Sequence, residues 1–361
     1  MFSADTQGIT PNEFLDIEMN RARDFVFFNA SEQKLLKENF LVKETIDATK
    51  ETALKKGNKW RRIEAILLLG YVGTGEVLAV LAKTALHRDE DIAYFSVKAL
   101  AQTKTMESVK LLTEIFIVKK NLRQIIAASF DGLSSRVADI FIELVNKEDP
   151  SLKIWALNLA SKVGSSGHMN IIKKLTMDPV DEVRAAACEC LGKIGGKDAV
   201  TYIEKRLVDK SWFVRAHAVI ALSELLGAAS LAKMMSLIND SSLTVIESVK
   251  NALENNIEEA LPYLKDIFKG NDDLAKKVAM EALEGSGHLE VIIRGAFKGK
   301  GVKQKQYEDI LKDVLSSGVY TGLISLIARF DDNEKANFLN KLRSINYAAS
   351  EELKNFILGK K

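Results

Sequence analysis

The sequence predicts an all-α protein, a solenoid of about eight helical hairpins closed by helical caps. Apolar residues recur with a helical period along the chain, and only 4 prolines interrupt them. A chain of 361 residues is long for one compact core, which leaves two domains or an array that grows along one axis. A pattern that recurs every 30 or 31 residues favours the array.

The repeat is aligned on one residue of each copy, which we call the anchor. The clearest copy is DPVDEVRAAACECLGKIG, residues 178–195, with Arg184 as its anchor. The copies RRIEAILLLGYVG and VRAHAVIALSELL are anchored on Arg62 and Arg215, and weaker copies fill the gaps. The eight anchors are Arg62, Ala93, Arg123, Lys153, Arg184, Arg215, Ile246 and Lys276.

Each copy predicts two helices. In the clearest copy, Asp178 is expected to cap the anchor helix, and Gly192 and Gly195 to end it. The second helix is expected in DAVTYIEKRLV, after which Asp209 begins the next copy. Two short helices cannot bury their apolar faces alone, so neighbouring hairpins are expected to stack around a continuous core.

Two rows of positions are expected to form that core. The row three residues after the anchor holds mostly small side chains, which let neighbouring anchor helices approach closely, and the row seven residues after it is mostly leucine. The first row is Ala65, Ser96, Ile126, Ala156, Ala187, Ala218, Val249 and Ala279. The second row is Leu69, Leu100, Phe130, Ala160, Leu191, Leu222, Leu253 and Leu283.

The chain before the repeats predicts a cap. Residues 1–9 are expected to be disordered, and residues 10–44 to form an N-terminal helical cap, because Thr10-Pro11-Asn12-Glu13 has the pattern of a capping box. The first helix of this cap is amphipathic. It also fits a partner helix or an interfacial membrane helix, the one place where membrane contact is expected.

The repeats are predicted over residues 45–297. GAFKGKGVKQKQ follows them, and residues 298–305 within it are expected to form a basic linker. Residues 306–361 predict about four further helices, either a C-terminal cap or degenerate repeats.

The pattern D-P-x-x-x-V-R-x-x-A-x-x-x-L-G-x-I-G resembles the HEAT repeat, in the short variety named after phycobilisome lyases. The resemblance implies a right-handed superhelix whose anchor helices line the concave face. It also implies a ladder in which an aspartate before one helix pairs with an arginine at the start of another. Asp178, Arg184, Asp209 and Arg215 fit this ladder, and Ile246 breaks it.

Composition excludes several classes of protein. A net charge of +2 gives no global field for nucleic acid, and the 2 cysteines, Cys188 and Cys190, cannot make a disulfide framework and are expected to be buried. No signal peptide or membrane-spanning stretch is expected, and a reducing cytoplasmic location fits best.

No catalytic, metal or cofactor site is expected. The 4 histidines, His87, His168, His217 and His288, lie in separate copies and form no His-Glu pair of the kind that HEAT-like hydroxylases use for iron. The glycine-rich segments GKIGGKDA and GYVGTGEV lack the spacing or context of nucleotide-binding loops and fall in the turn of the repeat.

Positions one, two and five after each anchor are expected to be partly exposed on the concave face. From these positions and the turn before the sixth anchor helix we select candidates for partner binding, since aromatic residues on such a face are typical anchors. The candidates are Tyr94, Lys98, Trp155, Asn158, Glu189, Trp212, Phe213 and His217. The alternative is that the aromatic ones fill gaps between imperfect repeats.

The leading hypothesis is a non-catalytic scaffold that binds a protein on the concave face. A bilin lyase-like function is the first alternative, which rests on the repeat subtype alone. Nucleic-acid binding is the second, because Lys59-Trp60-Arg61-Arg62, Lys119-Lys120 with Arg123, and Lys298 through Lys305 form basic clusters.

Overall fold

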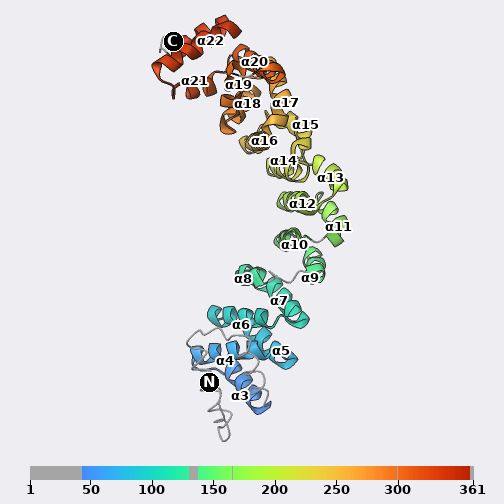
Figure 1. The fold of residues 1–361 in the computed structure, drawn as a ribbon. Coiled ribbons are helices and arrows are strands. Elements are labelled where there is room, and N and C mark those ends of the chain that lie inside the picture. The colour runs from blue at the N-terminus through green and yellow to red at the C-terminus, as the bar shows by residue number, and fades with distance from the viewer. Residues whose placement is uncertain (1–42, 130–136, 165, 299, 358–361) are drawn as a thin grey trace. The chain divides into compact units, whose positions relative to one another are not determined.

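A computed structural model describes residues 43–129, 137–164, 166–298 and 300–357 (Figure 1). Every regular element within these ranges is helical. The chain divides into two compact units, residues 1–159 and 160–361, and the division falls inside helix α10. The structure is an all-α solenoid, as the repeat predicted.

All eight anchors lie at the fourth residue of a helical segment. In the third copy this segment starts with a short 3₁₀ helix, Lys120–Leu122, which leads directly into α8. The anchor helices are α4 (Lys59–Val72), α6 (Glu90–Thr103), α8 (Arg123–Ser129), α10 (Pro150–Val163), α12 (Asp181–Ile194), α14 (Trp212–Leu226), α16 (Leu243–Asn255) and α18 (Asp273–Gly285).

Within each unit, the second helices of the repeats lie beside the anchor helices as another layer (Figure 1). In the C-terminal unit several of them are short and joined to 3₁₀ turns. They are α5 (Gly75–Ala85), α7 (Met106–Val118), α9 (Val137–Val145), α11 (Met169–Leu175), α13 (Val200–Glu204), α15 (Leu231–Met234), α17 (Ile257–Lys269) and α19 (His288–Lys298).

The two predicted core rows lie between these layers. Every described residue of both rows is 0% exposed, from Ala65 to Ala279 in the first row and from Leu69 to Leu283 in the second. Phe130 lies outside the described residues. The prediction that these rows form the core is therefore confirmed, and deletion of any of these buried leucine side chains would leave a cavity.

Two glycines set the spacing between neighbouring anchor helices. A Cβ atom on Gly192 of α12 would lie 2.8 Å from Cα of Ala221 on α14, and a Cβ on Gly70 of α4 would lie 2.9 Å from Cα of Ala99 on α6. The prediction that Gly192 ends its helix is wrong, because α12 continues to Ile194. Glycine is required at this position for close backbone approach rather than for a turn.

The chain before the repeats is described only from Lys43, where α3 (Lys43–Leu54) begins. Residues 1–9 and most of the predicted cap over 10–44 lie outside the described residues.

The basic linker predicted at 298–305 is wrong, because α20 (Gly301–Ser316) begins only three residues after α19 ends. Gly301, with a φ of 71°, makes the tight turn possible. Lys303 and Lys305 lie on the exposed face of α20, whereas Tyr307, Ile310 and Leu311 are buried. Three helices follow: α21 (Thr321–Ile327), α22 (Asp332–Ile345) and α23 (Tyr347–Ile357).

Among the described residues, one helical stretch, Trp212–Leu237, is long and apolar enough to cross a membrane by length and composition. The expectation that no stretch reaches this threshold is therefore wrong. The stretch is not a single smooth helix, since Gly227 ends α14 with a φ of 54°. The stretch is apolar because α14 packs between α12 and α16. Arg215 of α14 forms an ion pair with Asp240, and both observations fit a core helix of a solenoid.

Candidate interaction surface

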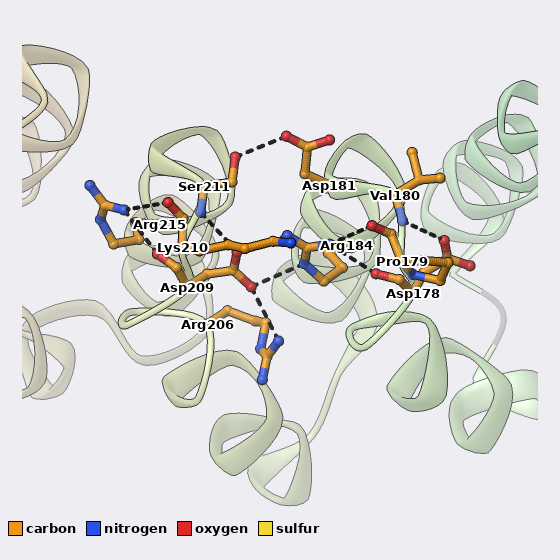
Figure 2. A network of polar contacts seen from close by, with 10 residues as sticks. All are labelled: Asp178, Pro179, Val180, Asp181, Arg184, Arg206, Asp209, Lys210, Ser211 and Arg215. Atoms are coloured by element: carbon orange, nitrogen blue, oxygen red, sulfur yellow. Dashed lines mark hydrogen bonds and ion pairs between the residues drawn. The ribbon is translucent and has the colours of Figure 1, made fainter.

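Arg184, in the first turn of α12, reaches the turn that precedes α14 (Figure 2). Its Nε donates to Asp209 Oδ2 at 3.0 Å and its Nη2 to Asp209 Oδ1 at 2.8 Å. Its Nη1 donates to the carbonyl oxygens of Asp178 and Pro179 at 2.9 and 3.1 Å. Arg184 is 4% exposed and Asp209 is 8% exposed, so this pair joins consecutive repeats through a buried contact.

The same contact recurs one repeat later. Arg215 donates from Nε and Nη2 to Asp240 at 2.8 and 2.6 Å, and from Nη1 to the carbonyl oxygen of Asp209 at 2.8 Å. In the N-terminal unit, Arg123 Nη2 lies 3.1 Å from Asp149 Oδ2, a similar pair in which the aspartate stands four rather than six residues before the next anchor. We refer to these three Arg–Asp pairs as the ladder.

The ladder stops at the seventh anchor. Ile246 carries no donor, and Asn239 Nδ2 instead donates to Asp272 at 2.5 Å. Lys276 contacts Asp273 of its own helix, at 3.5 Å, rather than a residue of a neighbouring repeat.

Each aspartate of the clear copies also shapes its own turn. Asp178, Asp209 and Asp240 accept the backbone N–H two residues further on, at 3.0, 3.1 and 2.8 Å. The prediction that Asp178 caps α12 is wrong, because Val180 occupies the cap position. Since Asp209 and Asp240 stand outside the helices, their carboxylates can face Arg184 and Arg215 of the preceding repeats.

The ladder carboxylates remain ionised. Burial by itself raises the pKa of Asp209, but hydrogen bonds from Arg184 and from the backbone N–H of Ser211 outweigh burial and hold this pKa below its usual range. The pKa of Asp240 is lowered in the same way, with Arg215 as the donor that offsets burial.

The ladder fixes the register of the anchor helices. It joins the N-terminal ends of α12 and α14, and the approach of Gly192 to Ala221 joins them nearer their C-terminal ends. The two helices therefore run parallel. Residues at the same distance from their anchors lie next to one another on the two helices.

Position five after the anchor is the accessible position of this face. Because an α-helix turns about 100° per residue, position five lies opposite the core rows, and positions one and two lie about 40° and about 60° to either side of it, nearer the neighbouring anchor helices. Ile220 at position five is 41% exposed, whereas Ala185, Ala186 and Ala216 at positions one and two are buried. The expectation of partial exposure therefore holds at position five of both helices and for His217 at position two of α14, and it is wrong for Ala185, Ala186 and Ala216.

Four of the candidate residues form one cluster on α12 and α14, which we call the aromatic cluster: Trp212, Phe213, His217 and Glu189. The Trp212 and Phe213 rings pack edge to face with 5.8 Å between their centroids, and the centroids of the Phe213 and His217 rings are 4.4 Å apart. His217 Nδ1 lies 2.6 Å from Glu189 Oε1, and this contact lowers the pKa of Glu189. Trp212 is 48% exposed and is the accessible end of the cluster.

The other candidates lie in the N-terminal unit, in two groups. Tyr94 is 40% exposed on α6, and the Nζ of Lys98, one turn further along, lies 5.5 Å from the centre of its ring. On α10, Trp155 is half-buried and meets Phe116 of α7 edge to face at 5.4 Å, and Asn158 is exposed. Trp155 thus packs partly against the second helix of an earlier repeat.

The two thiols are buried in α12, as expected. Cys188 is 0% exposed and Cys190 is 1% exposed, and burial raises the pKa of each to about 12. We expect neither thiol of the folded protein to react with a thiol-specific reagent near neutral pH, and both to react after unfolding in urea. Rapid reaction of one thiol in the folded protein would contradict this expectation.

Within the described ranges, no group of three or more His, Cys, Asp or Glu side chains is placed to hold a metal ion. A cavity of about 60 Å³ is lined by residues of the C-terminal helices, including Glu284, Leu289 and Leu326. This volume is well below that of a typical small-molecule pocket.

Comparison with known families identifies the repeat. Residues 137–223 and 169–254 match the family described as HEAT repeats. Residues 137–254 therefore contain HEAT repeats. No curated protein sequence matches it. The matched region covers the ladder from Arg184 to Asp240 and the aromatic cluster.

Solved structures with a similar fold share little sequence with this chain. Kap121p is 14% identical with a TM-score of 0.45, over 98% of this chain and 46% of that one. Kap95p, in a structure with RanGDP, is 12% identical with a TM-score of 0.44, over 90% of this chain and 55% of that one. An engineered protein is 16% identical with a TM-score of 0.31, over 98% of this chain and 96% of that one. The chain spans about half the length of Kap121p and Kap95p.

The sequence pattern missed several accessible residues beside the aromatic cluster. Leu243, the first residue of α16, is 79% exposed and stands at the same distance from its anchor as Trp212. Asp181 and Glu182 hold the two equivalent positions on α12 that Trp212 and Phe213 hold on α14. The signal was present in the repeat register, because these residues stand three or two positions before their anchors, as the candidates Trp212 and Phe213 do.

Proposed function

We propose that this protein is a non-catalytic scaffold that binds a partner protein on the face of its anchor helices opposite the core. The observation that carries the proposal is the aromatic cluster. Trp212 remains 48% exposed although its ring packs on Phe213, and Ile220 beside it is 41% exposed. Exposed aromatic and aliphatic side chains on rigid helices are common anchors of protein interfaces, because their burial contributes free energy at a small cost in side-chain entropy.

The ladder supports the same proposal. A binding surface that extends over several repeats needs a fixed register between their helices, and the buried Arg184–Asp209 and Arg215–Asp240 pairs supply it. The fold alone does not define a function, so the proposal rests on this surface rather than on the HEAT architecture.

The two alternatives have less support. In two of the basic clusters, Lys59 contacts Asp89 at 3.2 Å and Arg123 contacts Asp149, so these cations are neutralised by carboxylates of their own unit. A phosphate-binding face instead needs a concentrated stripe of available cations. The bilin lyase-like alternative rests only on the repeat subtype, and the assignment of the repeat to the phycobilisome-lyase variety stays a prediction.

A capture experiment tests the proposal. The full chain is immobilised, partners are captured from a lysate of its source, and their contact sites are mapped by cross-linking and mass spectrometry. We expect Trp212→Ala/Phe213→Ala to lose the partners that cross-link to α12, α14 or α16, because burial of these rings on binding is lost. Tyr347→Ala is the matched control, since Tyr347 is 66% exposed on α23, away from the cluster.

Circular dichroism must show unchanged helicity in the double variant, because Phe213 is half-buried. The single variant Trp212→Ala removes only an exposed ring and repeats the test without that risk. If both variants retain the same partners as the unmodified chain, the scaffold does not use this surface and the proposal is wrong.

A further inference from the structure

Carboxylates flank the aromatic cluster on the α12 side. Asp181 and Glu182 are the residues of α12 that correspond to Trp212 and Phe213 on α14. Ser211, just before Trp212, donates its hydroxyl to Asp181 Oδ2 at 3.0 Å, which places this carboxylate directly beside the start of α14 (Figure 2). Glu182 is exposed. The apolar surface of α14 is therefore bordered by two acidic side chains from the preceding anchor helix.

Carboxylates also flank the cluster on the α16 side. Glu247 follows its anchor by one position and is exposed, and Glu281 of α18 is exposed at the position equivalent to Ile220. Lys250 stands between them, with its Nζ 2.8 Å from Glu247 and 3.8 Å from Glu281, so one ammonium is shared by two carboxylates. This contact shows that α16 and α18 present these side chains on a common face.

The helical geometry gathers these groups on one surface. The positions two before, one after and five after the anchor fall within an arc of about 60°, opposite the core rows. On α12, α14, α16 and α18, this arc and the position three before the anchor carry apolar and acidic side chains. The exposed or half-buried apolar ones are Trp212, Phe213, Ile220, Leu243 and Leu274, the acidic ones are Asp181, Glu182, Glu189, Glu247, Asp273 and Glu281, and Thr244 and Asn251 are uncharged polar residues. Lys277 is the exposed base among these positions.

We propose that this surface binds a basic polypeptide segment whose lysines or arginines alternate with apolar anchor side chains. The inference rests on the proposed function, and it adds the chemical class of the partner. Apolar side chains of the segment would cover Trp212, Ile220 and Leu243, while its cations would lie against the carboxylates of α12 on one side and of α16 and α18 on the other. Complementary charge at the rim of an apolar contact steers association and selects the partner.

The negative charges of these carboxylates disfavour the other ligands that could cover an exposed apolar patch. A nucleic acid or an anionic membrane would bring phosphates against at least four exposed or half-exposed carboxylates, Asp181, Glu182, Glu247 and Glu281. An acidic peptide would meet the same repulsion. A basic segment with apolar residues satisfies both parts of the surface.

Peptide binding to the full chain tests the inference. Three fluorescein-labelled synthetic peptides of one length are compared by fluorescence anisotropy: lysine with leucine, glutamate with leucine in the same order, and lysine with serine. We expect the lysine–leucine peptide to bind at least about 10-fold more tightly than either of the others, with affinity that falls as salt is added. Equal affinity of the glutamate–leucine peptide, or no binding of the lysine–leucine peptide, would overturn the inference.

Charge reversal locates the binding site. Glu182→Lys/Glu247→Lys places cations on both flanks and should weaken the lysine–leucine peptide by about 10-fold or more. Glu259→Lys/Asp266→Lys makes the same change in net charge at two exposed positions of α17, and should leave the affinity within about 2-fold of the unmodified chain. If both double variants weaken binding equally, net charge rather than this surface attracts the peptide, and the inference is wrong.

The two proposals fail in different ways. If Trp212→Ala/Phe213→Ala loses captured partners but Glu182→Lys/Glu247→Lys retains them, the scaffold function stands and the basic partner is wrong. If the aromatic variant retains every partner, the scaffold proposal itself fails, whatever the peptides do.

Discussion

Replacement of Arg184 by methionine is expected to lower the free energy of unfolding by about 3–5 kcal/mol. The side chains of Arg184 and Asp209 are 5% and 4% exposed, so loss of the guanidinium leaves a buried carboxylate without its main partner. Arg206, with Nη1 3.2 Å from Asp209 Oδ2, remains in the variant and should place the loss nearer the lower end of this range. Urea unfolding followed by circular dichroism measures the change.

The control for this variant is Lys193→Met, an exposed position of the same helix, which should change stability by no more than about 0.5 kcal/mol. Asp209→Asn completes a double-mutant cycle with Arg184→Met, and the double variant should be less destabilised than the sum of the two single ones. A cost of Arg184→Met no larger than that of Lys193→Met would show that the pair does not hold the repeats together.

Acid should reproduce part of this loss in the unmodified chain. Because the pKa of Asp209 is lower in the folded state than its usual value near 3.9, the pair's contribution is complete above that value and disappears as the pH falls through the folded pKa. The difference in stability between the unmodified chain and Asp209→Asn should therefore shrink below about pH 4.

Replacement of Gly192 by alanine is expected to destabilise the protein by about 1–3 kcal/mol, although alanine is the better helix former. The added Cβ would lie 2.8 Å from Cα and 3.0 Å from the carbonyl oxygen of Ala221, which are backbone atoms that cannot move aside without shifting α14. Thermal or urea unfolding of the variant measures the effect.

Gly70→Ala should behave in the same way, because its Cβ would meet Ala99 of α6 at 2.9 Å. Gly75→Ala is the control, since a Cβ there has only ordinary contacts with Glu107 and stands at the exposed start of α5. An unchanged or increased stability of both Gly70→Ala and Gly192→Ala would mean that the helix spacing is not set by these glycines.

The core was predictable because its signal is local and periodic. Small residues such as Ala187 and leucines such as Leu191 recur at fixed distances from the anchor in most copies. Stacking of similar repeats then brings equivalent positions together. The role of Gly192 was not predictable in this way. Within one copy, glycine near the end of a helix suggests a terminus, and only the neighbouring Ala221 shows that it serves a close helix contact.

The candidate surface was predictable in part. His217 stands where the clearest copy has the small Ala186, and Trp212 and Phe213 stand where it has Asp181 and Glu182, and these departures are visible in the sequence. The contact of Glu189 with His217 and the flanking position of Asp181 depend on the register between two helices, which hydrogen bonds across the repeat boundary determine. Likewise, the lysines after residue 298 suggested a linker, but the buried residues beside Tyr307 make this segment a helix.

The ladder makes the array directional. The arginine of each pair belongs to one hairpin, and its aspartate belongs to the turn that begins the next one. The ion pair of Arg184 therefore forms only when the chain extends through Asp209. A fragment cut at the hairpin boundary, after Val208, would keep the arginine and discard its carboxylate. The natural module of this protein is therefore offset from its helical hairpin. A shortened or duplicated version has to be joined after the aspartate, in the turn that precedes the next anchor helix, rather than before that turn.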